Sequence, residues 1–469
     1  MHMIADLQLH SRFSRAVSPQ MTIPNIALWA ARKGIGLVAT GDWTHPLWMR
    51  EIKANLDEME NGLLKLRYTE VALKPGAYRG SLFAAHPFFL LATEISCIYS
   101  QGGKGRRVHT LIWVPTIASA DKINQEMTKR GCNLLSDGRP IAGLTSIQLA
   151  ELVLSIEPKA LVIPSHCWTP WFSVYGSMSG FDSIEEAFGP YAKHIYAVET
   201  GLSSSPAMNW RIKELDNRSI VSFSDAHSGP KIGREATVFE ISGQPSDISY
   251  QHIYDAITAF SLKAEDRKLK TRIACTIEFY PEEGKYHYTG HRVCNVRLTP
   301  EEAKRKGSTC TACGKPLTQG VMQRVEELAC RSESDLKLST KNYELITGKV
   351  SLPMVFSGTF PSRPPFVMLV PLQEIIAEAI GSPVASPKTQ AVYTKLTDHY
   401  KGEFAVLLTV STGDIAAIAG ERVAEGVDKV RKGDIVIDPG YDGIFGVVRI
   451  WKEGETVLVD KSKEQLGLF

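Results

Sequence analysis

MIADLQLH, at residues 3–10, is a short apolar run that ends in a histidine, and six later segments repeat this design. They are GIGLVATGDW (34–43) with Asp42, FFLLATEIS (88–96) with Glu94, VHTLIWVP (108–115) with His109, ALVIPSHC (160–167) with His166, HIYAVETG (194–201) with Glu199, and SIVSFSDAH (219–227) with Asp225 and His227. Amphipathic stretches such as residues 23–34, 147–159 and 208–217 lie between most of them and predict helices. Strands that alternate with helices indicate an α/β fold with a parallel sheet.

The polar residue of six of these seven runs stands at the end of its strand, and only His109 stands at the start of one. In a parallel α/β barrel the strand ends meet at one mouth, where such folds place their chemistry. An isolated buried histidine or aspartate is usually a hydrogen-bonded structural residue, but the series predicts a shared metal centre. Imidazoles with carboxylates suit Zn²⁺, Mn²⁺ or Fe²⁺, and two or three clustered ions suit phosphoester hydrolysis.

The composition is that of a globular protein of two or three domains, with 469 residues, 43% hydrophobic and 22% charged. The net charge of +2 means that any attraction to nucleic acid must come from a local basic patch. No apolar run reaches the roughly 18 residues of a membrane-spanning helix, and the first residues lack a signal peptide. We therefore expect a soluble, cytoplasmic protein.

Four residues in the middle of the chain have the spacing of a structural zinc site. His291 and Cys294 form one pair and Cys310 and Cys313 a second, each with two residues between its members, and His287 is an alternative to His291. Residues 263–306 hold 11 basic and 7 acidic residues, interleaved with Tyr280, Tyr286 and Tyr288. This pattern suits a nucleic-acid groove, and a solvated charged face explains it equally well.

Four aromatic residues follow the candidate ligand His166 within residues 165–177: Trp168, Trp171, Phe172 and Tyr175. On a loop over the metal ions they could stack on, or wedge beside, a nucleotide that leaves the helix. Alternatively, the loop packs on the barrel as a hydrophobic lid.

The last third begins with residues 363–381, a proline-rich entry followed by one strongly apolar helix. Helices are expected to dominate up to residues 434–451, DIVIDPGYDGIFGVVRIW, which read as two strands around a PGYDG turn. The tail, KSKEQLGLF, resembles the bacterial sliding-clamp-binding pentapeptide, although a frayed terminus would look the same. In that resemblance Gln465 makes polar contacts and Leu466, Leu468 and Phe469 fill a hydrophobic pocket.

Several of these segments resemble a known superfamily. ADLQLHSRFSRA, ATGDWTHP, TEIS, RRVHTLIWVP, PSHCWTPWF and SFSDAHS, in this order, resemble the motifs of the PHP (polymerase and histidinol phosphatase) superfamily. SDAHSGPKIGREAT, EEGKYHYTGHRVC and DPGYDGIFG are similar to the endonuclease Q family within it. The resemblance implies a distorted seven-stranded PHP barrel with a multinuclear metal centre. It also implies incision of double-stranded DNA 5′ to deaminated bases (uracil, hypoxanthine, xanthine) or abasic sites.

The same resemblance implies site residues and cofactors. The metal ligands would be His10, Asp42, Glu94, His109, His166, Asp225 and His227, with Asp225, His227 and Glu94 as the catalytic residues. Mg²⁺ or Mn²⁺ would serve catalysis, and Zn²⁺ the structural site and the active site. The superfamily's first motif is His-x-His, whereas this chain has Gln8 before His10, so one ion would bind weakly or be lost. His45 is an additional candidate.

The resemblance implies three parts: a nuclease barrel at residues 1–262, a basic linker with a zinc module at 263–330, and a mainly helical domain at 331–469 that helps clamp DNA. Two other functions stay open. One is a small-molecule phosphoesterase resembling histidinol phosphatase, which would have no use for a zinc module. The other is a catalytically impaired DNA-binding protein, for which Gln8 would be the first sign.

Overall fold

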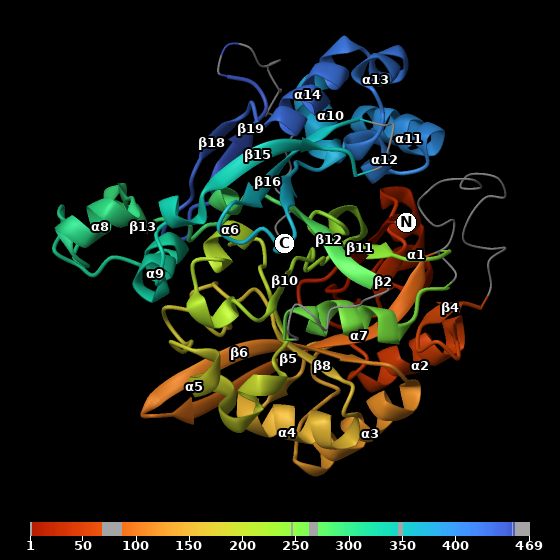
Figure 1. The fold of residues 1–469 in the computed structure, drawn as a ribbon, viewed down its shortest axis with the longest axis vertical. Helices are drawn as coiled ribbons and strands as arrows, with labels where there is room; N and C mark the ends of the chain where they lie inside the picture. Colours follow the sequence, from red (N-terminus) through yellow and green to blue (C-terminus); the bar gives the residue numbers. More distant parts are fainter. Residues whose placement is uncertain are drawn as a thin grey trace.

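The computed structural model describes residues 2–67, 87–244, 247–261, 271–345, 350–452 and 454. It has a mixed α/β fold around a large central sheet, which confirms the predicted fold class (Figure 1). The strands are β1 (His2–Asp6), β2 (Leu37–Ala39), β3 (Leu56–Glu58), β4 (Leu64–Leu66), β5 (Phe88–Gln101), β6 (Lys104–Val114), β7 (Ile141–Ala142), β8 (Leu161–Pro164), β9 (Ala197–Glu199), β10 (Ser219–Val221), β11 (Ala236–Ile241), β12 (Thr271–Glu278), β13 (Thr289–His291), β14 (Val296–Leu298), β15 (Leu338–Tyr343), β16 (Leu352–Ser357), β17 (Phe366–Met368), β18 (Val436–Asp438) and β19 (Val447–Arg449).

The helices cover the sheet and build the C-terminal third. They are α1 (Ile23–Lys33), α2 (Pro46–Asn55), α3 (Ile117–Lys129), α4 (Ser146–Ile156), α5 (Ile184–Phe188), α6 (Pro206–Asn209), α7 (Tyr250–Thr258), α8 (Pro300–Lys306), α9 (Val321–Leu328), α10 (Leu372–Ile380), α11 (Pro387–Tyr400), α12 (Glu403–Leu408), α13 (Thr412–Ala419) and α14 (Glu421–Lys432). In Figure 1, α3 and α4 lie beneath β5, β6 and β8, α10 to α14 gather at the opposite end, and β13, α8 and α9 project from one side. No helix of the described residues is long and apolar enough to cross a membrane.

All seven segments predicted to be strands form strands, namely β1, β2, β5, β6, β8, β9 and β10. The parallel sheet that the alternation predicts is present only in part, however. Strands β1, β2 and β5 run parallel, but β5 and β6 form a long antiparallel hairpin and β11 lies antiparallel to β1. His109 therefore lies in the middle of β6, opposite Ser96, which explains why it did not fit the pattern of strand ends.

The helix predictions hold at two of the three places. Helix α1 ends at Gly34, whose φ of 88° is the left-handed conformation that glycine adopts most easily, and α4 begins with a capping box between Thr145 and Gln148. The helix predicted for residues 208–217 is wrong, because only α6 and a short 3-10 turn form there. The buried Asn209 side chain accepts a hydrogen bond from Trp168 Nε1 at 2.8 Å, so it serves the core rather than a helix surface.

The central sheet contains strands from both sides of residue 262, where we expected the barrel to end. Its order is β15-β16-β17-β12-β11-β1-β2-β5-β4-β3, with β6, β7 and β8 joined at β5 and β6. Strand β12 pairs with β11 on one side and with β17 on the other. The first and last thirds of the chain thus share one sheet, and the division into three domains stays a prediction. The helices of the last third and the β18–β19 hairpin agree with the expected pattern.

A buried ion pair joins the C-terminal helices to α1. Lys33 Nζ lies 2.6 Å from Glu403 Oε2, and both side chains are buried. The same carboxylate accepts hydrogen bonds from the Tyr393 hydroxyl at 2.7 Å and from the Leu372 backbone N–H at 3.0 Å. These three partners of the Glu403 carboxylate therefore lie at the interface between α1 and the C-terminal helices.

Replacing Glu403 by Ala should lower the free energy of unfolding by roughly 3–5 kcal/mol, because Lys33 would stay buried without a counter-charge. Urea unfolding followed by circular dichroism measures the loss. The double variant Lys33→Met/Glu403→Leu should recover most of it, since the pair is then replaced by apolar side chains. A loss below about 1 kcal/mol, as for a surface pair, would contradict this prediction.

Candidate metal centre

Three of the predicted ligands follow their strands in the left-handed backbone conformation. Asp42 comes after β2, His166 after β8 and Asp225 after β10, with φ of 43°, 32° and 47°. This conformation costs a residue other than glycine about 1–3 kcal/mol, and such strain clusters at functional sites. The sharp turns direct these side chains toward the ends of the strands.

Glu94, His109 and His166 form the first group of candidate ligands, with ligand atoms within 4.8 Å of one another. Glu94 Oε1 contacts His109 Nδ1 and lies 3.3 Å from His166 Nε2. On its other side, Glu94 Oε2 accepts a hydrogen bond from Gln8 Nε2 at 2.9 Å. The Gln8 amide thus lies beside the group at the position where the PHP motif has histidine.

His10, Asp225 and His227 form the second group, again with ligand atoms within 4.8 Å. His10 Nε2 lies 3.1 Å from Asp225 Oδ1 and 3.4 Å from Glu94 Oε2, so the two groups meet at this imidazole. The side chains of Asp225 and His227 are 25% and 32% exposed, whereas those of His10 and Glu94 are buried. The second group is therefore the side of the centre that solvent reaches.

Asp42 orients His10 rather than joining either group. Its Oδ1 lies 3.0 Å from His10 Nδ1, and its Oδ2 accepts hydrogen bonds from the Ser11 backbone N–H, the Ser11 hydroxyl and the Ser14 hydroxyl. Both oxygens are thus engaged, which is the arrangement of a carboxylate that fixes a ligating histidine. The additional candidate His45 also lies outside both groups, and its ring stacks on Phe13 at 4.5 Å.

Among the residues that the structure describes, three buried atoms of the centre find no hydrogen-bond partner: Gln8 Oε1, His10 Nε2 and Asp225 Oδ1. The last two approach to 3.1 Å without the alignment of a hydrogen bond. Buried polar atoms are nearly always paired, so three unpaired ones at one place need an explanation. An amide oxygen, an imidazole nitrogen and a carboxylate oxygen are all donors to divalent cations, and the residues present therefore fit a metal centre.

Burial and neighbouring charges set the protonation of the two groups. Burial lowers the pKa of His109 to about 4, which leaves this imidazole neutral and able to bind a cation. Burial alone would also lower the pKa of His10, but the carboxylates of Asp42, Asp225 and Glu94 raise it well above its ordinary value. His10 thus carries a positive charge among the carboxylates, where a cation would replace its proton.

Arg139 belongs to the centre, although no motif or spacing in the sequence singles it out. Its Nη1 lies 3.5 Å from Glu94 Oε1, and the carboxylates of Glu94, Asp225 and Asp42 raise its pKa. Its neighbour Gly138 packs on Asp42, since a Cβ at that position would come 2.3 Å from Asp42 Oδ2. The loop of Gly138 and Arg139 reaches Asp42 and Glu94 only through the tertiary fold, so no sequence motif predicts the contact.

Two of the four aromatic residues predicted to contact DNA are core residues, so the prediction is wrong for Trp168 and Tyr175. Both are fully buried and their rings lie 4.8 Å apart. Tyr175 donates a hydrogen bond to Glu214 at 2.7 Å, and its backbone N–H bonds to Cys167, which folds the loop back onto the barrel. Trp171 and Phe172 are only partly buried, and the Phe172 ring lies 4.8 Å from His109.

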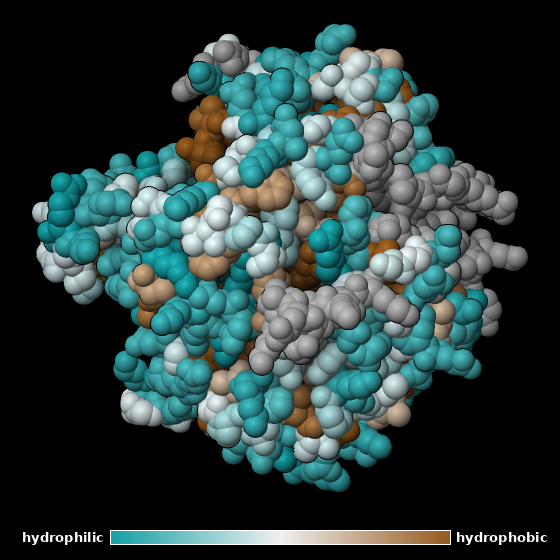
Figure 2. Space-filling model, viewed as in Figure 1, coloured by the Kyte–Doolittle hydropathy of each residue, from teal (hydrophilic) through white to brown (hydrophobic). Residues whose placement is uncertain are grey.

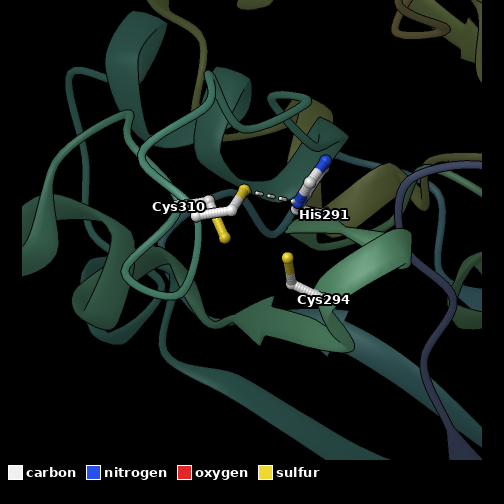
Figure 3. A group of neighbouring side chains, drawn as sticks. His291, Cys294 and Cys310 are labelled. Atoms are coloured by element: carbon white, nitrogen blue, oxygen red, sulfur yellow. Dashed lines mark hydrogen bonds between the residues drawn. The ribbon is translucent and has the colours of Figure 1, made fainter.

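A second, separate cluster consists of His291, Cys294, Cys310 and Cys313, whose ligand atoms lie within 4.8 Å of one another. Figure 3 shows His291, Cys294 and Cys310 converging from β13, the turn after it and the facing loop. Although burial acts in the other direction, backbone N–H groups of Ala312 and Cys313 lower the pKa of Cys310 to about 6, which favours the thiolate. The alternative ligand His287 lies outside the group, buried.

Other predicted binding residues are buried or undescribed. Tyr280 is buried and therefore cannot line a DNA groove. Residues 262–270 of the basic stretch lie outside the described residues, as do the predicted clamp-binding residues Gln465, Leu466, Leu468 and Phe469.

Comparison with known proteins adds sequence relatives. A family model described as the MJ0043 C-terminal domain matches residues 371–434, which contain α10 to α14. The uncharacterized protein MJ0043 of Methanocaldococcus jannaschii is 31% identical over 287 residues, which cover 60% of this chain but only 31% of that protein. The uncharacterized protein YqxK of Bacillus subtilis is 28% identical over 459 residues, 95% of this chain and 98% of that protein.

Two solved structures match nearly the whole chain. The lesion-specific endonuclease PfuEndoQ from Pyrococcus furiosus superposes with a TM-score of 0.75 at 28% identity, covering 97% of this chain and 96% of that one. Endonuclease Q bound to a 27-mer duplex with an abasic lesion at its active site matches with the same TM-score and identity, covering 99% and 100%. In fold and in sequence, over nearly its whole length, the chain resembles endonuclease Q.

Proposed function

We propose that this protein is a metal-dependent DNA repair endonuclease that cuts the backbone 5′ to deaminated bases (uracil, hypoxanthine, xanthine) or abasic sites. The observation that carries this proposal is the meeting of two groups of metal-ligand atoms at His10 and Glu94. The likeness to a lesion-specific endonuclease and to its complex with an abasic duplex supports it.

The buried and the exposed residues of the centre would have different roles. Divalent cations, Mg²⁺ or Mn²⁺ or Zn²⁺, would polarise the phosphoryl group and lower the pKa of a bound water. Buried Glu94 and His10 would hold them from below, while the more exposed Asp225 and His227 face the side from which a phosphodiester arrives. Arg139, beside Glu94, adds a fixed positive charge that would orient a phosphate oxygen.

Further parts of the proposal concern partners. The cluster of His291, Cys294, Cys310 and Cys313 would hold a structural zinc ion, as its three sulfurs and one imidazole suit tetrahedral Zn²⁺. The C-terminal residues Gln465, Leu466, Leu468 and Phe469 would bind a bacterial sliding clamp, in the cytoplasm. A phosphoesterase that acts on small molecules would have no use for either feature.

One assay separates the possible functions. The protein is incubated with Mg²⁺ or Mn²⁺ and labelled duplexes that carry uracil, hypoxanthine or an abasic site, beside an undamaged duplex and a phosphomonoester. Incision next to the lesion, with the undamaged duplex left intact, supports the proposal. Turnover of the monoester indicates a small-molecule phosphoesterase, and binding without cutting indicates an impaired DNA-binding protein.

Replacing Gln8 by His should tighten cation binding at the centre by about tenfold, because imidazole is a better ligand than an amide oxygen for a transition metal. Competition with a fluorescent chelator for Mn²⁺ measures the affinity. Gln8→Ala is the matched control, since it removes the amide without adding a ligand. Equal affinities for the native chain and both variants would contradict a role for position 8 in metal binding.

A further inference from the structure

The turn between β18 and β19 presents two large apolar side chains to solvent. Phe445 is 67% exposed and Ile444 beside it is also exposed, as is Val293 on the turn of the cysteine cluster. Figure 2 shows hydrophobic surface over the β18–β19 hairpin, on a face that is otherwise mostly hydrophilic. Large apolar side chains that stay exposed on a folded turn indicate a binding function.

Hydrogen bonds hold this turn firmly. Gly440 N–H bonds to Glu282 O at 2.8 Å and Gly443 N–H to Lys285 O at 2.8 Å. A Cβ at Gly446 would come 2.1 Å from Glu282 O, so the turn can pack this closely only with glycine there. The backbone on both sides of Phe445 is therefore held by the segment that leads into the cysteine cluster.

A line of aromatic rings leads from the metal centre to this turn. We call it the aromatic strip; it consists of Phe172, Trp171, Tyr286 and Phe445. Phe172 lies 4.8 Å from the ligand His109, and Trp171 lies 5.4 Å from Tyr286. Lys285 Nζ lies 5.7 Å from the Tyr286 ring and 5.6 Å from the Phe445 ring, and so joins the two.

Positive charges accompany the strip. Arg107 lies 5.5 Å from the Phe172 ring, Lys285 lies between the last two rings, and the Arg292 guanidinium lies beside Gly443 of the turn. None of these three cations forms an ion pair in the described part of the chain. The nearby Asp442 carboxylate is occupied, since it accepts hydrogen bonds from the Arg292 backbone and from Thr318. Aromatic rings beside unpaired cations form a surface that suits bases and phosphates.

We infer that Phe445 is a wedge that enters duplex DNA beside the lesion, while the other three rings of the aromatic strip carry the separated strand to the metal centre. This inference rests on the proposed function. A target nucleotide must leave the base stack before it can be processed, and architectural proteins open the stack by inserting an apolar side chain between base pairs. Phe445 meets the requirement of a wedge because it is aromatic, exposed and carried by a turn whose backbone is held.

The experiment compares the full-length native chain with Phe445→Ala and with the control Val384→Ala, which removes an exposed apolar side chain between α10 and α11. The substrates are an abasic duplex with 2-aminopurine next to the lesion and the same lesion in a single strand. Phe445→Ala should cut the duplex about tenfold more slowly, because the side chain that holds the base stack open is lost, and should cut the single strand at the native rate, because a single strand has no base pairs to separate. Val384→Ala should match the native chain on both, and equal melting temperatures show that all three are folded.

Binding is measured separately in Ca²⁺ by the fluorescence of 2-aminopurine, which rises when its stacking is broken. The native chain should raise it, and Phe445→Ala should not. Equal losses on duplex and single strand, or no loss on either, would overturn the wedge. The native chain could raise the fluorescence of 2-aminopurine and Phe445→Ala abolish that rise, while neither protein cuts the DNA. This result would support the wedge and refute the proposed nuclease.

Discussion

Asp225→Asn should lower the incision rate roughly 10³-fold or more, since the carboxylate oxygen that faces His10 would become an uncharged amide and a metal-assisted reaction would lose several kcal/mol of stabilisation. Asn tolerates the left-handed backbone of this position, where φ is 47°, so the chain should keep its fold. Single-turnover cleavage of an abasic duplex in Mn²⁺ measures the rate. Bound metal is measured by mass spectrometry after gel filtration.

Asp121→Asn is the control for this variant, because Asp121 forms an exposed pair with Lys53 away from both ligand groups. It should cut at the native rate. If Asp225→Asn also cut at the native rate while it remained folded, the group of His10, Asp225 and His227 would not be the reaction centre. If Asp225→Asn lost activity but kept its full metal content, Asp225 would act in the reaction and would not be needed to bind the metal.

Cys310→Ser should remove one zinc ion per chain, because a structural zinc site binds with an apparent free energy of about 10–16 kcal/mol that depends on all its thiolates. The loss should also loosen residues 289–318 and the β18–β19 turn, which is tied to this region through Asp442 and Thr318. Native mass spectrometry counts the ion, and hydrogen exchange locates the loosened segment.

Cys330→Ser is the matched control, as Cys330 is exposed and lies outside the cluster. It should keep the zinc ion and the protection of residues 289–318. Unchanged zinc content in Cys310→Ser would show that the four residues come together for another reason.

The strands and the cysteine cluster were predictable because their signals are local. Each apolar run that ended in a polar residue became a strand, and two pairs with a fixed spacing brought His291 and Cys310 together. Each strand and each pair of the cluster is decided within a few residues. The metal centre is different, because His10, Glu94 and Asp225 are distant along the chain, and their meeting was expected because the strand ends of an α/β fold gather at one mouth.

One error had a local cause. Gly102 and Gly103, with φ of 61° and 73°, form the two-residue turn that makes β6 antiparallel to β5 and so places His109 within its strand. The other errors concern features that depend on distant residues. Whether Asp42 is a ligand stays a prediction, but its hydrogen bonds from Ser11 and Ser14 could not be read from any pattern. Trp168 is buried because Asn209, far along the chain, accepts its indole N–H. No local pattern reports such partners.

The position of β1 within the sheet has a consequence during protein synthesis. Strand β1 is bordered by β2 and by β11, and His10 N–H bonds to Ala226 O at 3.0 Å. A nascent chain on the ribosome that ends before Ile241 cannot complete this border, although the candidate ligand His10 has already been synthesised. A chain that is still being synthesised therefore does not hold the candidate ligands together in one assembled centre until β11 has been made.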